Sequence, residues 1–245
     1  MPQDPDLHGT VMPLGQDGLL IGLGDGQSAH PHKALALAAD LSEAALIGVL
    51  EIAPTLASVQ VRFDPDLVSR AGLRAQIETI LRRCKADDAP AKPRRIWTIP
   101  ASFGGDDGPQ LAQACALAGV SEIDAIREIT AQEFSVLAIG FAPGQPYLGM
   151  LPEHWAMPRQ PDLTPQVPAG ALVTALRQLV LFANPSPTGW RWIGSCAFLP
   201  FKVDRTEPFA LRPDDRIQFE QVDAQTIADL RLCPEGMGGA RRMTL

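Results

Sequence analysis

The stretch Gly140–Pro152 has the sequence GFAPGQPYLGMLP, and it is followed by VPAG at residues 167–170 and SPTGW at residues 186–190. Together the three segments hold five prolines, five glycines and Tyr147, the only tyrosine of the chain. Proline fixes φ, and glycine permits turns and close backbone approaches that other residues cannot make. Backbone of this kind is rigid and irregular, which suits a binding site. The alternative interpretation is a set of tight turns between the strands of a barrel.

The residues around these segments predict short strands broken by glycine and proline. The predicted strands are Ile96–Pro100, Phe134–Ile139, Leu172–Leu176, Leu179–Phe182, Trp192–Gly194 and Arg216–Phe219. Short strands with frequent turns indicate an all-β barrel rather than a parallel sheet. Two helices are expected within this region. One is Pro109–Ala118, with proline in its first turn, and the other begins at Ser121, where an acid three residues later resembles a capping box.

The first 90 residues predict a smaller unit of strands and helices. Its expected elements are the strand Gly18–Gly22, the helix His32–Leu46, the strands Ile47–Ala53 and Ser58–Phe63, and the helix Leu73–Cys84. Apolar and polar residues alternate in the last of these strands, which suits a sheet with one solvated face. The order strand–helix–strand–strand–helix fits a ferredoxin-like two-layer sandwich.

A charged segment separates the two predicted units. Residues Lys85–Arg95, KADDAPAKPRR, contain proline and no large apolar side chain, which is typical of a linker. We therefore expect an α+β protein with a ferredoxin-like domain at residues 1–90 and a β-barrel domain at residues 91–245.

Composition limits the classes of function. The chain has 245 residues, 46% hydrophobic and 20% charged, as in globular proteins. Its net charge of −7 argues against a nucleic-acid partner, because phosphate binding requires clustered Lys and Arg. We see no signal peptide and no apolar run near the about 20 residues of a membrane span, so a cytoplasmic protein without membrane association is expected. The cysteines and histidines show no metal-ligand spacing, so no metal site is predicted.

The order and spacing of the motifs resemble the family of the 5-oxoprolinase B subunit, also called allophanate hydrolase subunit 1. This family includes a bacterial inhibitor of a sporulation histidine kinase. The resemblance covers most of the chain and rests on Phe103–Pro109 (FGGDDGP), Gly140–Pro152, Pro158-Arg159, Val167–Gly170, Ser186–Trp190, Trp192–Gly194 and Leu211–Phe219. Each motif alone is only turn chemistry, whereas their order and spacing together are specific.

The resemblance implies a ferredoxin-like domain followed by a cyclophilin-like β-barrel. It also implies a partner, a homologous barrel subunit of the type called allophanate hydrolase subunit 2 or the 5-oxoprolinase C subunit. With this partner and a third subunit, family members cleave 5-oxoproline to glutamate using ATP. The leading expectation is therefore a subunit of an ATP-dependent amidohydrolase that acts on a small amide. ATP enters by resemblance alone, because the sequence has no GxxxxGK[ST] motif.

Several positions depart from the family pattern. Ile129 stands where the family has a histidine, so a general acid or base is missing there. Leu176 and Arg177 stand where the family has glycines, which predicts a restricted approach for a ligand. The other replaced positions include Phe134, Gln145, Met150, Phe182 and Thr188. These departures indicate an altered or lost ligand and keep open a non-catalytic regulatory or binding subunit, such as a histidine-kinase inhibitor.

Four side chains are predicted to bind the substrate: Tyr147, Gln178, Ser186 and Arg191. The Tyr147 hydroxyl suits a hydrogen bond to a ligand, against a tyrosine packed at the barrel rim. The Gln178 amide suits an amide or carboxylate, against a solvated strand glutamine. Ser186 has no neighbouring base in sequence, so turn capping is expected first and ligand binding second. Arg191 suits an anionic group, against plain solvation.

Three further residues carry weaker expectations. Arg159, like Arg191, suits an anionic substrate. Glu133 and Asp215 match acids of the family and are either bases or structural carboxylates. A peptidyl-prolyl isomerase is suggested only by the barrel, and a fold does not determine a function.

Overall fold

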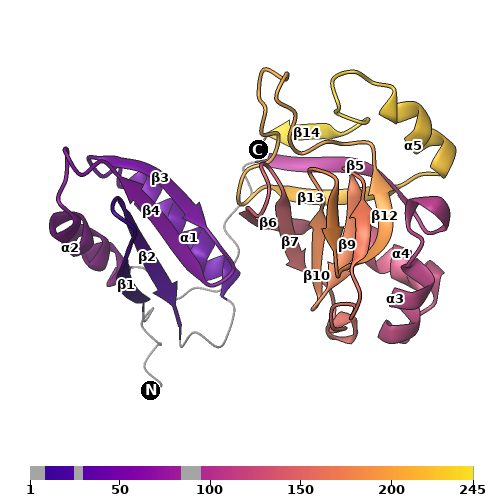
Figure 1. The fold of residues 1–245 in the computed structure, drawn as a ribbon, viewed down its shortest axis with the longest axis horizontal. Helices are drawn as coiled ribbons and strands as arrows, with labels where there is room; N and C mark the ends of the chain where they lie inside the picture. Colours follow the sequence, from indigo (N-terminus) through magenta and orange to yellow (C-terminus); the bar gives the residue numbers. More distant parts are fainter. Residues whose placement is uncertain (1–8, 25–29, 84–94, 245) are drawn as a thin grey trace. The chain divides into compact units, whose positions relative to one another are not determined.

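The structure is a computed structural model, which describes residues 9–24, 30–83 and 95–244 (Figure 1). Contacts divide the chain into two compact units, Met1–Lys92 and Pro93–Leu245. The predicted linker Lys85–Arg95 lies outside the described residues, except for Arg95, which begins a strand.

The first unit is a four-stranded antiparallel sheet with two helices. Its described elements are β1 (Gly9–Leu14), β2 (Gly18–Leu23), α1 (Pro31–Glu43), β3 (Val49–Pro54), β4 (Ser58–Phe63) and α2 (Arg70–Leu81). The strand order is β1-β2-β4-β3. Helix α2 begins at Arg70, three residues before the predicted start at Leu73. Ser69 caps it, because its side chain accepts a hydrogen bond from the Gly72 amide at 3.1 Å. Cys84 lies outside the described residues.

The sheet is ferredoxin-like, with one strand supplied from a different point in the chain. In the usual order, the strand that follows the second helix pairs with the first strand of the sheet. Here β1, which precedes the rest of the unit, pairs with β2 in that place. Strand β1 was not predicted because GTVMPL shows no apolar alternation: it contains a proline and buries only Val11. Proline is tolerated at such an edge position.

One apolar core holds the first unit together. The sheet contributes Val59, Val61 and Phe63, the alternating residues of β4 that the sequence places on one face. The helices contribute residues at helical spacing, including Leu37 and Leu41 of α1 and Leu73, Ile77 and Leu81 of α2. The unit is therefore a two-layer sandwich, as predicted.

The second unit contains the remaining described elements. The first of these are β5 (Arg95–Phe103), η1 (Gly105–Asp107), α3 (Leu111–Ala118), α4 (Glu122–Ala131), β6 (Phe134–Ile139), β7 (Pro146–Met150) and η2 (Glu153–Trp155). They are followed by β8 (Thr164–Val167), β9 (Ala171–Ala175), β10 (Gln178–Leu181), β11 (Ser186–Thr188), β12 (Arg191–Cys196), β13 (Arg216–Gln221), α5 (Ala224–Arg231) and β14 (Arg241–Thr244).

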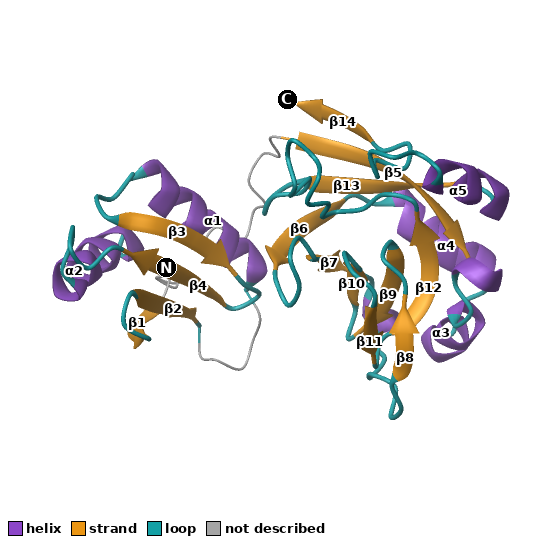
Figure 2. Cartoon of the chain, turned by 45° about the horizontal axis from the view of Figure 1, so that its top comes forward, coloured by secondary structure: helices purple, strands orange, loops and turns teal. Residues whose placement is uncertain are grey.

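Seven strands of this unit close into a barrel (Figure 2). The pairing runs β12-β9-β10-β7-β6-β13-β5, and β5 pairs again with β12 through Ala101–Phe103. The first half of the same long strand pairs with β14, which lies outside the ring of seven. Helices α3, α4 and α5 pack against β12, β13 and β5 respectively. The prediction of an α+β protein with a cyclophilin-like barrel is confirmed.

Strands β9 and β10 bury apolar residues on both faces. Leu172, Leu179 and Leu181 belong to the main core of the barrel unit. Val173 and Val180, which alternate with them, belong to a smaller cluster that also holds Trp190. A pocket opens beside the smaller cluster; Val180 and Trp190 belong to both, and Tyr147 of the pocket packs against the cluster.

The turn between β9 and β10 explains one departure from the family pattern. Leu176 and Arg177 both have positive φ, 53° and 66°, as a two-residue type I′ hairpin requires. Glycine suits these positions because it adopts positive φ without steric cost, and neither Leu176 nor Arg177 lines the pocket beside the smaller apolar cluster. Their side chains are therefore not part of this pocket, and the expectation that they restrict a ligand stays a prediction. Arg177 anchors the turn through an ion pair with Glu153 and a 2.9 Å hydrogen bond from Nε to the Leu151 carbonyl.

Leu176→Gly is expected to stabilise the barrel unit. The Leu176 side chain is 53% exposed, so its removal loses little burial, while a left-handed backbone costs a non-glycine residue about 1 kcal/mol. We expect a rise in melting temperature of about 2–4 °C. Tryptophan fluorescence measures this unit alone, because Trp97, Trp155, Trp190 and Trp192 all lie in it. Leu176→Ala is the control, since it keeps the Cβ atom; an equal gain in both variants would contradict the explanation.

Candidate functional site

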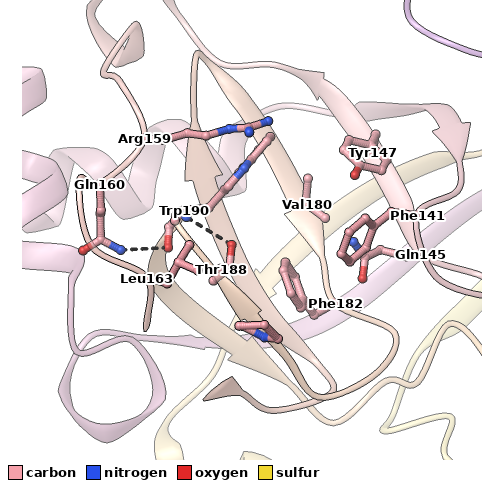
Figure 3. Close-up of a pocket in the computed structure, with 12 residues that line it drawn as sticks. Phe141, Gln145, Tyr147, Arg159, Gln160, Leu163, Val180, Phe182, Thr188 and Trp190 are labelled. Carbon is pink, nitrogen blue, oxygen red and sulfur yellow. Dashed lines mark hydrogen bonds between the residues drawn. The ribbon is translucent and has the colours of Figure 1, made fainter. Parts of the chain in front are cut away.

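An open pocket of about 310 Å³ lies on the side of the barrel that carries the smaller apolar cluster (Figure 3). It is lined by Phe141, Gln145, Tyr147, Arg159, Gln160, Leu163, Val180, Phe182, Pro187, Thr188, Gly189 and Trp190. Two of the three glycine- and proline-rich segments, GFAPGQPYLGMLP and SPTGW, contribute to this lining. The third, VPAG, ends at Gly170, whose backbone amide donates to the carbonyl of the lining residue Phe182 at 2.8 Å.

Tyr147 lines the pocket from β7, with its ring edge-on to Trp190 at a centroid distance of 6.3 Å. Burial raises the pKa of its hydroxyl above the ordinary value, while Arg159 and the Gln145 side chain act in the opposite direction. A phenol with a raised pKa stays protonated at neutral pH. Tyr147 can therefore donate a hydrogen bond to a ligand in this pocket.

The other three predicted residues are not among those that line the pocket. Gln178 is 6% exposed at the start of β10, and its Nε2 atom is buried without a hydrogen-bond partner. Ser186 begins β11 and pairs with Val167, next to the lining residue Pro187. Arg191 is 5% exposed, and burial lowers the pKa of its guanidinium.

Arg191 joins two segments that border the pocket. Its Nη1 donates to the Pro158 carbonyl at 2.7 Å. The backbone amide of Gln160 joins the same two segments, since it donates to the Gly189 carbonyl at 2.7 Å. Gln160 Nε2 adds a third bond to the Trp190 carbonyl at 3.1 Å. These bonds fix the segment that carries Arg159 against the segment that carries Trp190.

Arg159 is the cation of the pocket. Its guanidinium lies over the Trp190 ring, 5.5 Å from the centroid, as Figure 3 shows. A cation held in this way is positioned without being neutralised. No hydrogen bond or ion pair joins the Arg159 guanidinium to any other described residue, so its donors are available for an anionic group.

Some polar groups of the lining are already used by the protein. Gln160 Oε1 accepts from Gln110 Nε2 at 2.7 Å, and Thr188 Oγ1 accepts from the Trp190 amide at 3.1 Å. Gln145 differs: it is 2% exposed, and its Oε1 atom is buried without a partner. Among the described lining residues, Tyr147, Arg159 and Gln145, together with the hydroxyl proton of Thr188, therefore supply the side-chain polar groups that a ligand can engage.

Phe141 stands at the rim of this arrangement. Its backbone is in the left-handed region with φ of 69°, and its ring is 76% exposed. Non-glycine residues in this conformation concentrate at ligand clamps and other functional sites. Figure 3 shows Phe141 and Gln145 on one side of the pocket and Leu163 and Gln160 on the other.

Ile129 lies in the main core rather than in the pocket. It is fully buried on α4 and packs in the same cluster as Leu148 and Leu151. The replacement of the family histidine therefore fills apolar space here. Ile129 does not line the pocket, so its replacement of the family histidine removes no proton carrier from this lining. Phe134, another replaced position, is likewise a core residue, whereas Gln145, Phe182 and Thr188 line the pocket.

The described ranges supply few groups for metal or acid–base chemistry. Within them, no cluster of three His, Cys, Asp or Glu side chains could hold a metal ion. Also within them, no helix combines the length and the apolar character that crossing a bilayer requires. The described residues that line the pocket include no His, Cys, Lys or carboxylate. The pocket can therefore bind and orient a ligand, with the Tyr147 phenol and the Arg159 guanidinium as hydrogen-bond donors.

Comparison with known proteins establishes the family. Residues 10–211 match the family described as carboxyltransferase domain, subdomain C and D. The chain belongs to this family. It is 29% identical over 219 residues to the B subunit of 5-oxoprolinase from Bacillus subtilis (strain 168), covering 85% of this chain and 91% of that protein. It is 36% identical over 143 residues to the B subunit of 5-oxoprolinase from Escherichia coli O157:H7, covering 58% and 66%.

A solved structure, that of TTHA0988, extends the comparison. It superposes with a TM-score of 0.68 and 29% identity over 84% of this chain. The matched part is only 40% of the TTHA0988 chain, so this protein spans less than half of that relative. The predicted resemblance to the family of the 5-oxoprolinase B subunit is confirmed, with this chain as a divergent member.

Proposed function

We propose that the chain is a non-autonomous subunit of an ATP-dependent amidohydrolase of the 5-oxoprolinase type. It would act with a homologous barrel subunit, and its contribution would be the pocket around Tyr147, Arg159 and Gln145. The observation that carries the proposal is a lining with a free cation and free polar groups in a chain similar to the 5-oxoprolinase B subunit.

The composition of the pocket supports a shared site. Opening an amide requires an activated nucleophile or a general base. The described lining residues hold neither a carboxylate nor His, Cys or Lys. The chain would therefore bind and position the substrate, while the reacting groups would come from the partner subunits.

ATP does not fit this pocket. A triphosphate is held by several cations or by a glycine-rich cradle of backbone amides at a helix start. The pocket has Arg159 as its only cation among the described lining residues, and it adjoins strands and loops. We place ATP elsewhere in the complex.

The substrate would present its carboxylate to Arg159 and its carbonyl to Tyr147. The four residues predicted from the sequence would differ in how directly they act on the substrate. Tyr147 would contact the substrate, while Arg191 would position Arg159 through the Pro158 carbonyl. Gln178 and Ser186 would support the wall formed by β10 and β11.

Arg159→Met tests this assignment in the reconstituted complex. We expect KM for 5-oxoproline to rise about tenfold, or ~1.4 kcal/mol, because a charge-assisted hydrogen bond to the carboxylate is lost. ATP-dependent glutamate formation is the measurement. Arg159→Lys keeps the charge and should recover part of the loss. Arg127→Met, at an exposed position of α4 outside the pocket, is the matched control. Equal KM values for all of these proteins would remove Arg159 from the site.

The alternative is a regulatory or binding subunit, such as a histidine-kinase inhibitor. The absence of carboxylate, His, Cys and Lys side chains from the described pocket lining also fits this function. Restoring a histidine at position 129 does not separate the two functions, because Ile129 is fully buried in the core. Reconstitution does: a complex that assembles and gains no amidohydrolase activity would favour the alternative.

A further inference from the structure

Gln145 is a buried polar side chain whose acceptor is left open. Its backbone is satisfied within the loop, since its amide donates to the Ala142 carbonyl and its carbonyl accepts from the Gly140 amide, each at 3.1 Å. Its side chain lines the pocket and is 2% exposed, and Oε1 has no hydrogen-bond partner. A buried acceptor without a donor destabilises the folded protein, so a position of this kind calls for an explanation.

A hydrogen-bond donor on a bound ligand would satisfy this buried acceptor. We propose that Gln145 Oε1 accepts a hydrogen bond from an N–H group of the ligand, and that this contact makes the pocket selective for a free N–H. Two donors of the pocket are engaged elsewhere: Gln160 Nε2 donates to the Trp190 carbonyl, and the Trp190 backbone amide donates to Thr188 Oγ1. The Tyr147 hydroxyl lies beside the Gln145 side chain, and Oε1 has no hydrogen-bond partner in this arrangement.

The surroundings define the chemical class of the ligand. Arg159 provides a cation over Trp190, so an anionic group is favoured on that side. Val180, Phe182 and Leu163 form apolar walls between the polar groups, which suits a small, compact hydrocarbon frame. The ligand is thus a small carboxylate with an unsubstituted N–H. The choice of an amide N–H rather than another donor rests on the proposed function.

A pair of ligands isolates the contact. Binding of 5-oxoproline and of N-methyl-5-oxoproline to the full chain is measured by calorimetry, and the ratio of the two Kd values is the readout. For the unmodified chain we expect 5-oxoproline to bind about tenfold more tightly, since the lost hydrogen bond to a buried acceptor corresponds to such a factor. For Gln145→Met, which keeps the length and removes the acceptor, the ratio should fall to about one.

Two variants complete the test. Gln132→Leu removes another amide with a buried, unpartnered Nε2, outside the pocket, and should keep the tenfold preference. Gln145→Glu keeps an acceptor oxygen at the same place and should also keep the preference for 5-oxoproline, although the added negative charge weakens the binding of both ligands. If Gln145→Met does not fold, the Glu variant decides, because loss of the preference there overturns the proposal.

The outcomes separate this inference from the proposed function. Equal ratios in the unmodified chain and Gln145→Met overturn the inference even if the complex hydrolyses 5-oxoproline, as does a complete lack of 5-oxoproline binding. A preference that depends on Gln145, combined with no hydrolysis by the complex, leaves the inference standing and removes the amidohydrolase.

Discussion

Replacing Asp215 by asparagine is expected to lower the free energy of unfolding of the barrel unit by about 3–5 kcal/mol. Asp215 is 3% exposed and forms a buried ion pair with Arg95. Its carboxylate also accepts hydrogen bonds from Trp97 Nε1 at 3.1 Å and from the Arg212 amide at 2.9 Å. Asparagine would leave the buried Arg95 guanidinium without its counter-charge. Urea unfolding followed by tryptophan fluorescence measures the change.

Glu133→Gln is the matched control for this substitution. Both acids fit the family pattern, but Glu133 is exposed just before β6, so its neutralisation should change stability by no more than about 0.5 kcal/mol. The double variant Arg95→Met with Asp215→Asn should be less destabilised than the sum of the single variants, because the double variant leaves no unpaired charge. Additive losses would contradict a structural role for this pair.

Gly170→Ala is expected to destabilise the barrel unit by at least about 3 kcal/mol, or to prevent its folding. Gly170 ends the VPAG segment with φ of 85°, and a Cβ atom there would lie 2.2 Å from the Cys196 carbonyl oxygen. The backbone cannot move away easily. The Gly170 amide donates to the Phe182 carbonyl and its carbonyl accepts from the Cys196 amide, each at 2.8 Å. The yield of folded protein and its urea midpoint measure the effect.

Gly140→Ala is the matched control from the same set of motifs. Nothing lies within 4 Å of a Cβ atom at Gly140, and its φ is not in the positive range. We expect a change within about 0.5 kcal/mol. A similar loss in both variants would show that the glycine-rich segments are sensitive for a reason other than backbone geometry at Gly170.

Much of the fold follows from local patterns in the sequence. Alternation in Ser58–Phe63, helical spacing in α1 and α2, and the cap at Ser121 all predicted the elements that the structure contains. Ser121 accepts a hydrogen bond from the Asp124 amide at 3.1 Å, as the capping pattern indicates. Strand β1 escaped prediction because an edge strand needs little burial, and its pairing with β2 is a contact between segments that the pattern does not encode.

The candidate site was harder to predict, because a resemblance identifies positions in the sequence and not where their side chains point in the fold. The family pattern marked Leu176 and Ile129 as changes in a site, yet one belongs to a hairpin turn and the other to the core. The same pattern marked Gln145 as the loss of an aromatic residue, whereas the structure makes it a buried acceptor in the pocket. The sequence marks Arg159 only as one of two arginines that suit an anion. The position of its guanidinium over the Trp190 ring depends on the tertiary structure.

The most direct test is ATP-dependent glutamate formation from 5-oxoproline by a complex of this chain with its homologous barrel subunit and the third subunit. The measurement compares the complete complex with one from which this chain is omitted, and with one that carries Tyr147→Phe and Arg159→Met together. We predict activity only when the chain is present, and a KM raised by about tenfold or more in the double variant. An assembled three-subunit complex without activity, or equal kinetics with and without this chain, would contradict the account.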